Sequence, residues 1–331
     1  MNKIEIFLKQ LKNYKFILPP LSGYTDFPYR EILSIFKPPF TCTEMIKSRA
    51  LFENNKKTIK MLLKEKGNHL KGVQLLGNNP SLMKEAAIKI EKMRFDYIDI
   101  NMGCIVKKVA SKGEGISLMK DENLASEICK AVSSSVNLPV TAKVRISPGK
   151  IKIDFLSFAK KLEESGIAAI TIHGRSGEKK FEANVNYEII KASAELLNIP
   201  VIANGGIFSG SDALKVLEYT KVQAVMPGRA LLGNPWIIEE LKAAFQGKQF
   251  TPPKLNDKKE IFLMHYNNMK NFYGQKSSLF KIRKILPWYF SNIKNAKLLR
   301  IESQKINSEK DLFKIIDNIK EENGQIVFVK P

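Results

Sequence analysis

Cysteine and histidine are both scarce in this sequence, which has three of each among its 331 residues. The cysteines stand at positions 42, 104 and 129 and form no C-x-x-C pair. So few cysteines exclude a small secreted scaffold held together by disulfides, and they fit a reducing compartment inside the cell. Because histidines are as rare, a zinc site built from cysteine and histidine is a poor interpretation, and we expect no metal ion.

Long apolar runs are missing too. No segment approaches the roughly 20 consecutive apolar residues that cross a bilayer. The N-terminal residues are interrupted by Lys3, Lys9, Lys12 and Lys15, so they lack the unbroken apolar stretch of a signal peptide. We therefore expect a cytoplasmic protein that does not enter a membrane.

Acidic residues are the third deficit, with 33 Asp and Glu against 54 Lys and Arg, which gives a formal net charge of +21 at pH 7. A balance this positive favours a polyanionic partner, nucleic acid first and an anionic membrane surface second. The alternative is lysine enrichment spread evenly over the chain, so the distribution of charge has to decide. Hydrophobic residues still make up 44% of the chain, which excludes a mostly disordered protein.

Short apolar runs alternate with longer amphipathic stretches between about residues 16 and 245. The runs are FILPP (16–20), FTCTEM (40–45), KGVQLLG (71–77), DYIDIN (96–101), PVTAKVR (139–145), AAITIHG (168–174), PVIANGG (200–206) and VQAVMPG (222–228). Parallel strands connected by helices have this spacing. Eight such units predict an α/β fold, a (β/α)8 TIM barrel, although an open doubly wound sheet has the same local pattern.

The remainder of the chain has a different pattern. After a proline-rich segment at 251–257, apolar residues mostly recur at three- and four-residue spacing, which predicts helices. Ser308 followed by Asp311 is typical of a helix start. We therefore expect two domains, a barrel over residues 1–245 and a small helical domain over residues 246–331.

Basic residues concentrate in one part of this second domain. Residues 270–305 hold nine Lys or Arg, at positions 270, 276, 281, 283, 284, 294, 297, 300 and 305, against one acidic residue, Glu302. Phe272, Tyr273, Phe280, Trp288, Tyr289 and Phe290 are interleaved with them. A solvated lysine-rich helix face is the alternative, but this mixture favours a nucleic-acid surface, where cations meet phosphates and rings stack on bases. We take Lys281, Arg283 and Lys284 as candidate substrate-binding residues.

In a (β/α)8 barrel the active site lies at the carboxyl ends of the strands. The residues found there are Pro20, Leu21 and Ser22; Glu44; Gln74; Asn101; Lys143 and Arg145; His173 and Arg175; Asn204, Gly205 and Gly206; and Gly228 and Arg229. Packing alone does not explain polar groups at so many strand ends. We therefore expect these residues to converge on one ligand site.

Two glycine-rich stretches follow the seventh and eighth runs, ANGGIFSG and MPGRALLGNP. Barrels often bind phosphate at these loops, because backbone N–H groups can approach the anion there. Gly205, Gly206 and Gly228 would allow that approach, and Arg229 would add positive charge. The two loops together predict a cofactor that carries phosphate.

Cys104 lies in NMGC, the loop after the fourth run, where a barrel places its chemistry. An ordinary thiol is mostly protonated at neutral pH, so a cysteine in this loop can donate a proton. Cys42 falls within a predicted strand and Cys129 within a predicted helix, so we expect both to be buried small hydrophobes. Lys143 lies inside an apolar run and needs an electron-rich partner, because an unpaired buried charge is costly; a flavin ring edge would serve.

Taken together, these segments resemble the tRNA-dihydrouridine synthases, flavoprotein reductases of uridine in RNA. The resemblance covers nearly the whole chain. It rests on LPPLSGYTDFPYR (18–30), DINMGC (99–104), AKVR (142–145), IHGRS (172–176), IANGGI (202–207) and PGRALLGNPW (227–236), which follow in the family's order, and on RKILPWY (283–289), which resembles the bacterial B-type branch.

The resemblance implies FMN as the cofactor and NADPH or NADH as the reductant. Pro20, Leu21 and Ser22 would lie at the flavin, Gln74, Lys143 and His173 would contact its ring system, and Asn204, Gly205, Gly206, Gly228 and Arg229 would hold its phosphate. Asn101, Arg145 and Arg175 would help to place the uracil, and Cys104 would be the general acid.

The implied reaction is the reduction of uridine to 5,6-dihydrouridine in tRNA. A hydride passes from NAD(P)H through FMN to C6 of uracil, and Cys104 gives a proton to C5. The uridine has to be turned out of the folded RNA into the barrel mouth, while the basic helical domain holds the RNA by its phosphates. We expect a monomer with no obligatory protein partner.

Other functions stay open at this point. An FMN barrel of the dihydroorotate or dihydropyrimidine type acts on a free pyrimidine, although so small a substrate needs no basic domain. A barrel that binds RNA without catalysis would keep the basic surface and lose the flavin. The sequence does not distinguish tRNA from ribosomal RNA, identify the uridine, or choose between NADPH and NADH.

Overall fold

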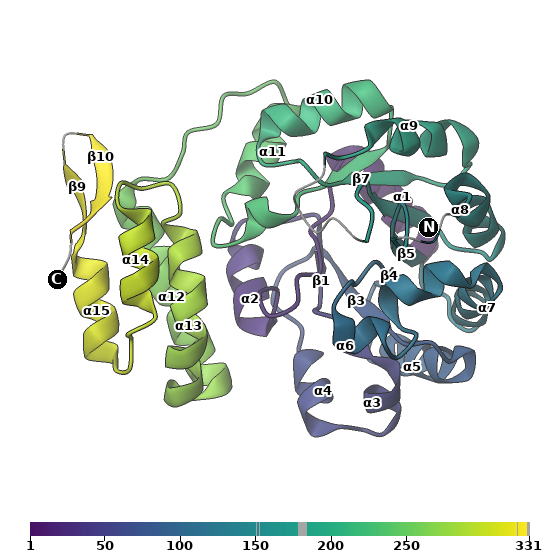
Figure 1. Ribbon diagram of the computed structural model, residues 1–331, viewed down its shortest axis with the longest axis horizontal. Coiled ribbons are helices and arrows are strands. Elements are labelled where there is room, and N and C mark those ends of the chain that lie inside the picture. Colours follow the sequence, from purple (N-terminus) through teal and green to yellow (C-terminus); the bar gives the residue numbers. More distant parts are fainter. Residues whose placement is uncertain (150, 152, 178–183, 323, 330–331) are drawn as a thin grey trace.

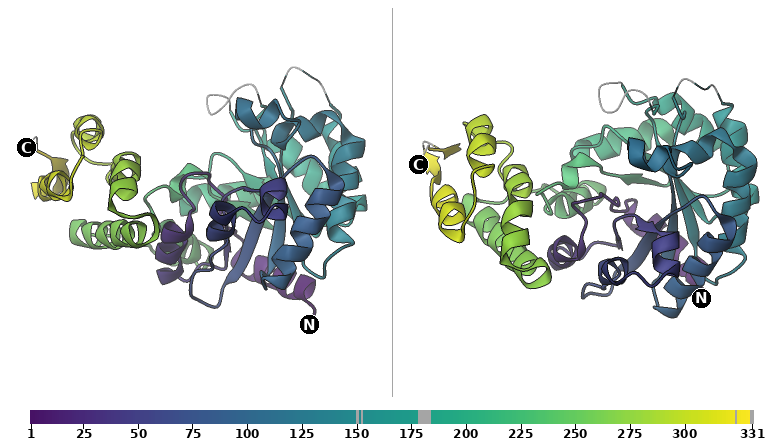
Figure 2. Two further views of the ribbon diagram at one scale, coloured as in Figure 1. Left: turned by 90° about the horizontal axis from the view of Figure 1, so that it is seen from below. Right: turned by 60° about the horizontal axis from the view of Figure 1, so that its bottom comes forward.

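The computed structural model describes residues 1–149, 151, 153–177, 184–322 and 324–329. A barrel of strands ringed by helices occupies one side of the molecule, and a smaller stack of helices with a β-hairpin occupies the other (Figure 1). Two further views show the same separation (Figure 2).

The barrel strands form one parallel sheet in the order β1-β3-β4-β5-β6-β7-β8, with β2 paired to the end of β3. Their bounds are β1 Phe40–Cys42, β2 Ile46–Lys47, β3 Leu70–Leu76, β4 Tyr97–Met102, β5 Val140–Arg145, β6 Ala169–His173, β7 Val201–Asn204 and β8 Ala224–Met226. Each of the last six strands overlaps the apolar run predicted for it. Strands β4, β6, β7 and β8 are buried along their whole length, which explains why they are marked by continuous apolar runs.

The first predicted strand, at residues 16–20, is reduced to a single bridge between Phe16 and Val225 of β8. Two backbone hydrogen bonds of 2.9 and 3.1 Å flank this bridge and join residues 15–17 to β8. The ladder stops there because Pro19 and Pro20 have no N–H to donate. The predicted (β/α)8 barrel is therefore confirmed, with its first strand shortened by the prolines.

Helices connect the strands on the outside of the barrel. Their bounds are α2 Phe27–Ile35, α3 Ser48–Phe52, α4 Lys56–Met61, α5 Pro80–Lys92, α6 Lys107–Ala110, α7 Glu122–Ser133, α8 Phe155–Glu164, α9 Tyr187–Leu196, α10 Gly210–Thr220 and α11 Ile237–Phe245, with short 3-10 turns η1 Gly115–Lys120 and η2 Arg229–Leu231. Helix α5 illustrates the sequence logic: Asn79 caps its first turn, Pro80 suits its first position, and Met83, Ala86 and Ile90 repeat on its buried face. No helix in the described ranges combines the length and apolar character that a membrane span requires.

A helix ahead of the barrel, α1 Lys3–Tyr14, closes the amino-terminal end of the strands. The ring of its Phe7 is fully buried and lies 5.2 Å from the ring of Phe40 and 5.4 Å from that of Tyr97, at the starts of β1 and β4. Leu11 belongs to the same apolar cluster. With this end plugged, the carboxyl ends of the strands form the open mouth of the barrel.

Beyond α11 the described chain forms helices α12 Leu255–Tyr273, α13 Gln275–Tyr289, α14 Ala296–Ser303 and α15 Glu309–Asp317, then strands β9 Ile319–Glu322 and β10 Gln325–Phe328. Ser308 caps α15 as predicted: its side chain accepts from the Asp311 amide, and the Asp311 carboxylate accepts from the Ser308 amide. The helical prediction for this region is confirmed. The antiparallel hairpin of β9 and β10 adds to it.

Helix α2 of the barrel packs against α12 and joins the two regions. The Tyr273 hydroxyl donates to the Asp26 carboxylate at 2.8 Å, and the Tyr29 ring stacks on His265 with centroids 4.9 Å apart. Gly233 lies so close to α13 that a Cβ there would stand 2.4 Å from the backbone of that helix. Buried apolar side chains continue from the barrel into the helices, so α13 is held in a fixed place against the barrel.

Candidate active site

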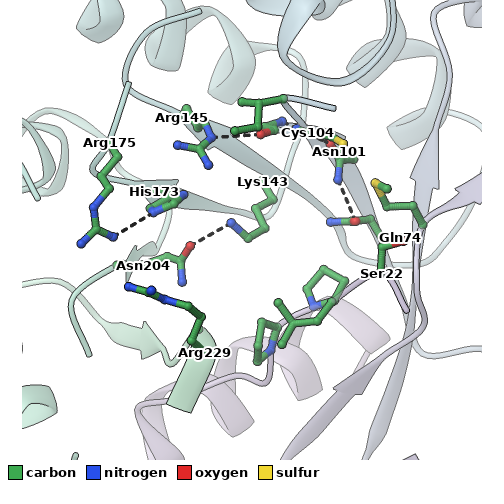
Figure 3. A pocket seen from close by; sticks show the side chains of 18 of the residues that line it. Ser22, Gln74, Asn101, Cys104, Lys143, Arg145, His173, Arg175, Asn204 and Arg229 are labelled. Atoms are coloured by element: carbon green, nitrogen blue, oxygen red, sulfur yellow. Dashed lines mark hydrogen bonds between the residues drawn. The ribbon is translucent and has the colours of Figure 1, made fainter. Parts of the chain in front are cut away.

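A cavity of about 630 Å³ opens at the carboxyl ends of the strands (Figure 3). Fifteen predicted residues line it: Pro20, Leu21, Ser22, Gln74, Asn101, Cys104, Lys143, Arg145, His173, Arg175, Asn204, Gly205, Gly206, Gly228 and Arg229. Of the strand-end residues that the sequence predicts, Glu44 does not line the cavity; its carboxylate accepts from the backbone amide of Gly23 instead. What each lining residue does there remains a prediction.

The register of the strands places the polar side chains in neighbouring positions. Asn101 of β4 pairs with Lys143 of β5, Arg145 of β5 pairs with His173 of β6, and His173 pairs with Asn204 of β7. Because side chains alternate along a strand, Lys143 and Arg145, two residues apart, point to the same side. A row of five polar side chains therefore crosses four strands at the mouth.

A continuous series of hydrogen bonds connects Asp99, on β4, to the loop that carries Cys104. Gln74 donates from Nε2 to the Asp99 carboxylate at 2.7 Å and accepts through Oε1 from Asn101 Nδ2 at 2.8 Å. Asn101 Oδ1 accepts from the backbone amides of Gly103 and Cys104 at 3.2 and 3.0 Å. An ionised carboxylate can only accept, so it determines which end of each amide faces its neighbour. The position of the Cys104 backbone therefore depends on Asp99.

Asp99 is a functional candidate that the sequence analysis misses. Its side chain is buried, and burial raises its pKa to about 6 although hydrogen bonds from Thr141 and Gln74 favour the charged form. The Thr141 hydroxyl donates to it at 2.6 Å. The signal that could have found it is an acidic residue inside the apolar run 96–101, because a buried carboxylate is costly unless it is paired.

Lys143 is the cation that interacts with Asp99. Its ammonium donates to Asn204 Oδ1 at 2.9 Å, and Asn204 is itself fixed because its Nδ2 donates to the Met226 carbonyl at 2.8 Å. Burial, followed by the charge of Arg145, lowers the pKa of Lys143 to about 8, while Asp99 acts in the opposite direction. A lysine that titrates so near neutrality inside a cleft is typical of a functional site.

Arginines surround His173. Arg175 Nη1 lies 3.4 Å from His173 Nε2, and Arg145 is held by two backbone carbonyls at 3.0 and 3.1 Å. Burial, followed by the charges of Lys143, Arg145, Arg175 and Arg229, lowers the pKa of His173 to about 2. The imidazole is therefore neutral. Because a guanidinium can only donate, Nε2 is the acceptor in this contact and Nδ1 carries the proton.

The loops after β7 and β8 form the glycine-rich end of the cavity. Gly205 and Gly206 have φ angles of 110° and 73°, in the left-handed region that favours glycine, and a Cβ on Gly205 would lie 3.0 Å from a neighbouring imidazole. At Gly228 the nearest atom to a Cβ would be 3.9 Å away, so the backbone there is open to a ligand. The guanidinium of Arg229 follows, 5.4 Å from the centre of the Phe208 ring.

The three cysteines lie where the sequence predicts. Cys104 is partly exposed and lines the cavity, whereas Cys42 on β1 and Cys129 on α7 are buried. Lys107 and Phe208 also line the cavity and are missed by the sequence analysis, because they stand several residues beyond the strand ends. Within the described ranges, no group of three His, Cys, Asp or Glu side chains is arranged to hold a metal ion.

The three basic residues predicted in the helical region lie outside this cavity, on α13. The ammonium of Lys281 lies 4.3 Å from the centre of the Tyr273 ring, and that of Lys284 lies 4.3 Å from the centre of the Tyr24 ring. Arg283 donates to a backbone carbonyl in the loop after α14 at 2.7 Å. Arg283 therefore helps to hold this loop through a hydrogen bond, whereas each lysine contacts an aromatic ring.

Comparison with known proteins extends the resemblance seen in the sequence. Residues 17–323 match the family model described as dihydrouridine synthase (Dus). The chain belongs to the dihydrouridine synthase family. A tRNA-dihydrouridine synthase B of Pasteurella multocida is 35% identical to it over 303 residues, which cover 91% of each chain. A tRNA-dihydrouridine synthase B of Pseudomonas aeruginosa is 33% identical over 88% of each chain, and a probable tRNA-dihydrouridine synthase of Rickettsia bellii is 34% identical over 85% of this chain and 86% of the relative.

Solved structures support the fold of this chain. A 6-hydroxypseudooxynicotine amine oxidase from Pseudomonas geniculata superposes with a TM-score of 0.53 at 13% identity, over 70% of this chain and 47% of that one. The crystal structure of TcOYE with pHBA gives a TM-score of 0.50 at 13% identity, over 79% and 94% of the two chains. At such low identity the likeness shows the fold alone.

Proposed function

We propose that this protein reduces uridine to 5,6-dihydrouridine in tRNA, with FMN as its cofactor and NADPH or NADH as the reductant. The observation that carries the proposal is the convergence of Cys104, Lys143, His173 and Arg229 on one cavity in a chain of this family. The thiol of Cys104 and the guanidinium of Arg229 lie on opposite sides of it (Figure 3). A proton donor and a phosphate site would need this separation.

One end of the cavity has the features that the phosphate of FMN requires. Backbone N–H groups can turn toward an anion at Gly205 and Gly206 because both take positive φ angles that glycine allows, and the backbone at Gly228 has open space beside it. Arg229 would contribute a charge-assisted hydrogen bond, and Asn204 fixes the start of the loop through its contact with β8. The volume of the cavity also lies within the ~300–1,000 Å³ typical of small-molecule sites.

The middle of the cavity suits the flavin ring system. Lys143 uses one of its three N–H groups on Asn204, which leaves two for the electron-rich edge of the ring. Gln74 is fixed at both ends of its amide, and the neutral His173 can lie against the ring without adding a charge. The backbone of residues 20–22 would form the wall beside the ring.

FMN, when bound and reduced by NAD(P)H, supplies a hydride to C6 of the uracil ring. Cys104 completes the reduction, because its Sγ–H gives a proton to C5 and the C5=C6 double bond becomes a single bond. Asn101 keeps Cys104 in place by accepting from its amide. Arg145, held by two carbonyls, and Arg175 would orient the uracil. The thiolate regains its proton from solvent before the next cycle.

The tRNA part of the proposal rests on the helical region. Residues 246–331 would be the RNA-binding domain and residues 1–245 the catalytic domain. A uridine stacked in folded RNA must be turned out to reach the cavity, so the RNA around it has to be held close by. Lys281 and Lys284 on α13, with Arg283 between them, would contact its phosphates. We place this activity in the cytoplasm and assign it to the monomer.

Purified protein, an unmodified tRNA transcript and NADPH test the proposal. We expect a yellow protein that absorbs near ~450 nm, oxidises NADPH, and forms dihydrouridine that mass spectrometry detects in the digested tRNA. Cys104→Ala should remove the product. Cys129→Ala is the matched control, because it deletes a buried thiol that does not line the cavity.

Three results would indicate another function. Reduction of free uracil or uridine monophosphate as fast as tRNA would identify a free-pyrimidine oxidoreductase. Product formed only in ribosomal RNA would keep the chemistry and change the substrate. A colourless protein that binds RNA and oxidises no NADPH would identify an RNA-binding protein without catalysis.

A further inference from the structure

Three neighbouring cavities lie in series between the candidate active site and the outer helices. The active-site cavity shares Phe208 and Arg229 with a second cavity, of about 460 Å³, between the barrel and helices α12 and α13. The second cavity shares Trp288 and Ser291 with a third, of about 620 Å³, between α13 and α14. The shared residues make each cavity a neighbour of the next, in a series from the barrel mouth to the outer helices.

The third cavity, here named the α13–α14 pocket, combines an apolar wall with a cationic rim. It is lined by Arg283, Lys284, Pro287, Trp288, Ser291, Lys297, Arg300, Ile301 and Gln304. Four of these described residues are cations and none is acidic. Pro287, Trp288 and Ile301 supply the apolar surface, and the Ile301 side chain is 50% exposed.

Two of the four cations are available to a ligand. Lys297 is exposed and makes no hydrogen bond or ion pair with the rest of the described chain, and Arg300 is exposed and contacts only a carbonyl of its own helix, at 3.4 Å. Arg283 holds the loop after α14, and Lys284 lies over the ring of Tyr24. The rim therefore presents positive charge that no carboxylate of the pocket neutralises.

We propose that the α13–α14 pocket binds a second unpaired nucleotide of the same RNA whose uridine enters the barrel. This inference rests on the proposed function. A nucleotide uses both features of the pocket at once: its base packs against Trp288 and Ile301, and its flanking phosphates meet Lys297 and Arg300. Unstacked bases of single-stranded segments are the parts of RNA that proteins read most readily.

Two-point binding gives the enzyme a way to choose its uridine. The barrel and α13 are held together by a continuous core, so the separation between Cys104 and the α13–α14 pocket is fixed. An RNA that fills both sites must present its target uridine at one distance from the second nucleotide. The pocket would therefore select a position in the RNA, which the chemistry at Cys104 cannot do.

The series of cavities favours RNA over other anionic partners. An acidic peptide would satisfy the cations but has no reason to extend over the neighbouring cavities past Trp288 to Arg229. A membrane would need a broad outward surface, and the apolar residues here line a recess between two helices. A polynucleotide is the one class that places bases in both cavities and phosphates between them.

Photocrosslinking tests where the RNA lies. An unmodified tRNA transcript made with 4-thiouridine is bound to the holoenzyme and irradiated, and the crosslinked peptides are identified by mass spectrometry. We expect crosslinks within residues 287–301 in addition to those at the barrel mouth. Crosslinks at the mouth with none in residues 287–301 would overturn the proposal.

Charge reversal in the rim tests the contribution of the phosphates. The double variant Lys297→Glu/Arg300→Glu should bind the tRNA at least tenfold more weakly, and the log–log slope of its salt dependence should fall by about two. Lys310→Glu/Lys314→Glu is the matched control, since it makes the same change in net charge at exposed positions of α15 that do not line the pocket. Equal loss in both pairs would show a diffuse charge effect and would overturn the pocket.

A change in the apolar wall separates base packing from charge. Ile301→Ala removes apolar contact at an exposed position, so the fold is preserved. We expect tRNA binding about tenfold weaker with an unchanged salt slope, because no phosphate contact is lost. Wild-type affinity in this variant would mean that no base packs there.

The experiments distinguish an error in the pocket assignment from an error in the proposed reaction. If the wild type forms dihydrouridine in tRNA while the rim variant behaves like the α15 control, the function stands and the pocket is not a nucleotide site. If the wild type forms no dihydrouridine in any RNA, yet crosslinks reach residues 287–301, the proposed reaction is wrong and the pocket still binds RNA.

Discussion

The Asp99 carboxylate accepts a hydrogen bond from Gln74 at 2.7 Å, and this contact helps to set the position of the loop that follows β4. Gln74 has to present its Nε2 to Asp99, so its Oε1 is left to accept from Asn101. The oxygen of Asn101 then faces the amide of Cys104. Asp99 does not line the cavity, so its role toward Cys104 is one of positioning.

We expect Asp99→Leu to slow uridine reduction at least tenfold, because it removes the acceptor that orders the two amides. Asp99→Asn should be milder, since its side-chain oxygen can still accept from Gln74 while its amide turns to Thr141. Alkylation of Cys104 by iodoacetamide in the cofactor-free protein should be faster in the leucine variant, whose loop loses its anchor. Equal alkylation rates in the wild type and both variants would show that the loop is held in another way.

The pH dependence of uridine reduction should be bell-shaped. Burial raises the pKa of Asp99 to about 6, so its charged form is lost as the pH falls through that value. Burial and Arg145 lower the pKa of Lys143 to about 8, so the ammonium is lost as the pH rises through that value. Pre-steady-state rates between pH 5 and 9 should therefore fall on both sides of a maximum near neutrality (about pH 7).

The same pair predicts how the profile changes in Asp99→Asn. Removing the carboxylate takes away the opposite charge that favours the ammonium of Lys143, so the alkaline limb should move to lower pH. The acidic limb should disappear, since the asparagine does not titrate. An alkaline limb that stays in place would mean that Lys143 does not control it.

Cys104→Ala should separate the two halves of the reaction. The thiol acts only on uracil, so reduction of the bound flavin by NADPH should continue while dihydrouridine formation falls by ~10²–10⁴-fold, the usual contribution of a general acid. Stopped-flow absorbance follows each half in turn. Dihydrouridine formed at the wild-type rate would refute the assignment of Cys104 as the proton donor.

Arg229→Ala should yield protein depleted in flavin, because the charge next to Gly228 would no longer hold the phosphate of FMN. Excess FMN should restore part of the activity, and fluorescence titration of the cofactor-free protein should show weaker binding. Arg49→Ala, on the exterior helix α3, is a control with the same loss of charge. If the two variants bound FMN equally well, the phosphate would have to lie elsewhere.

The strands and the residues at their ends could be predicted from the sequence because parallel strands are buried on both faces. A polar side chain at the end of such an apolar run, such as Asn101 or His173, is conspicuous. Asp99 was missed because it lies inside a run, where only its cost of burial indicates that it is paired. The first strand was predicted too long because the apolar content of residues 16–20 hides the effect of two prolines on the ladder.

Contacts between distant segments could not be predicted in this way. Nothing near Arg283 in the sequence indicates that it donates to the carbonyl of Ile306, and the stacking of Tyr29 on His265 joins residues from the two regions of the chain. The α13–α14 pocket depends on how two helices pack, so its residues appear in the sequence only as part of a basic cluster. The composition of residues 270–305 predicts an RNA-binding region, whereas the pocket itself is formed by the packing of α13 against α14.

The contacts on α13 mean that the basic cluster has to be tested in two separate experiments, one for Arg283 and one for the two lysines. Arg283→Ala would lose its hydrogen bonds to the loop after α14, at a cost of about 1 kcal/mol in the free energy of unfolding, so weaker RNA binding by that variant would be ambiguous. A thermal melt should show this loss. The lysines make no such contact, so they test the surface more cleanly.

Lys281→Ala/Lys284→Ala should weaken tRNA binding and reduce the log–log salt slope by about two, one for each lost phosphate contact. The ammonium groups lie over aromatic rings, and each such contact is worth ~0.5–1 kcal/mol, so a thermal melt should show a loss of stability similar to that of Arg283→Ala although no loop loses a hydrogen bond. Lys310→Ala/Lys314→Ala, on α15, removes the same charge elsewhere in the helical region and should leave most of the affinity. If the α13 pair bound tRNA as tightly as the α15 pair at low and at high salt, this face of α13 could not be the RNA surface, and the RNA would have to reach the barrel mouth from another side.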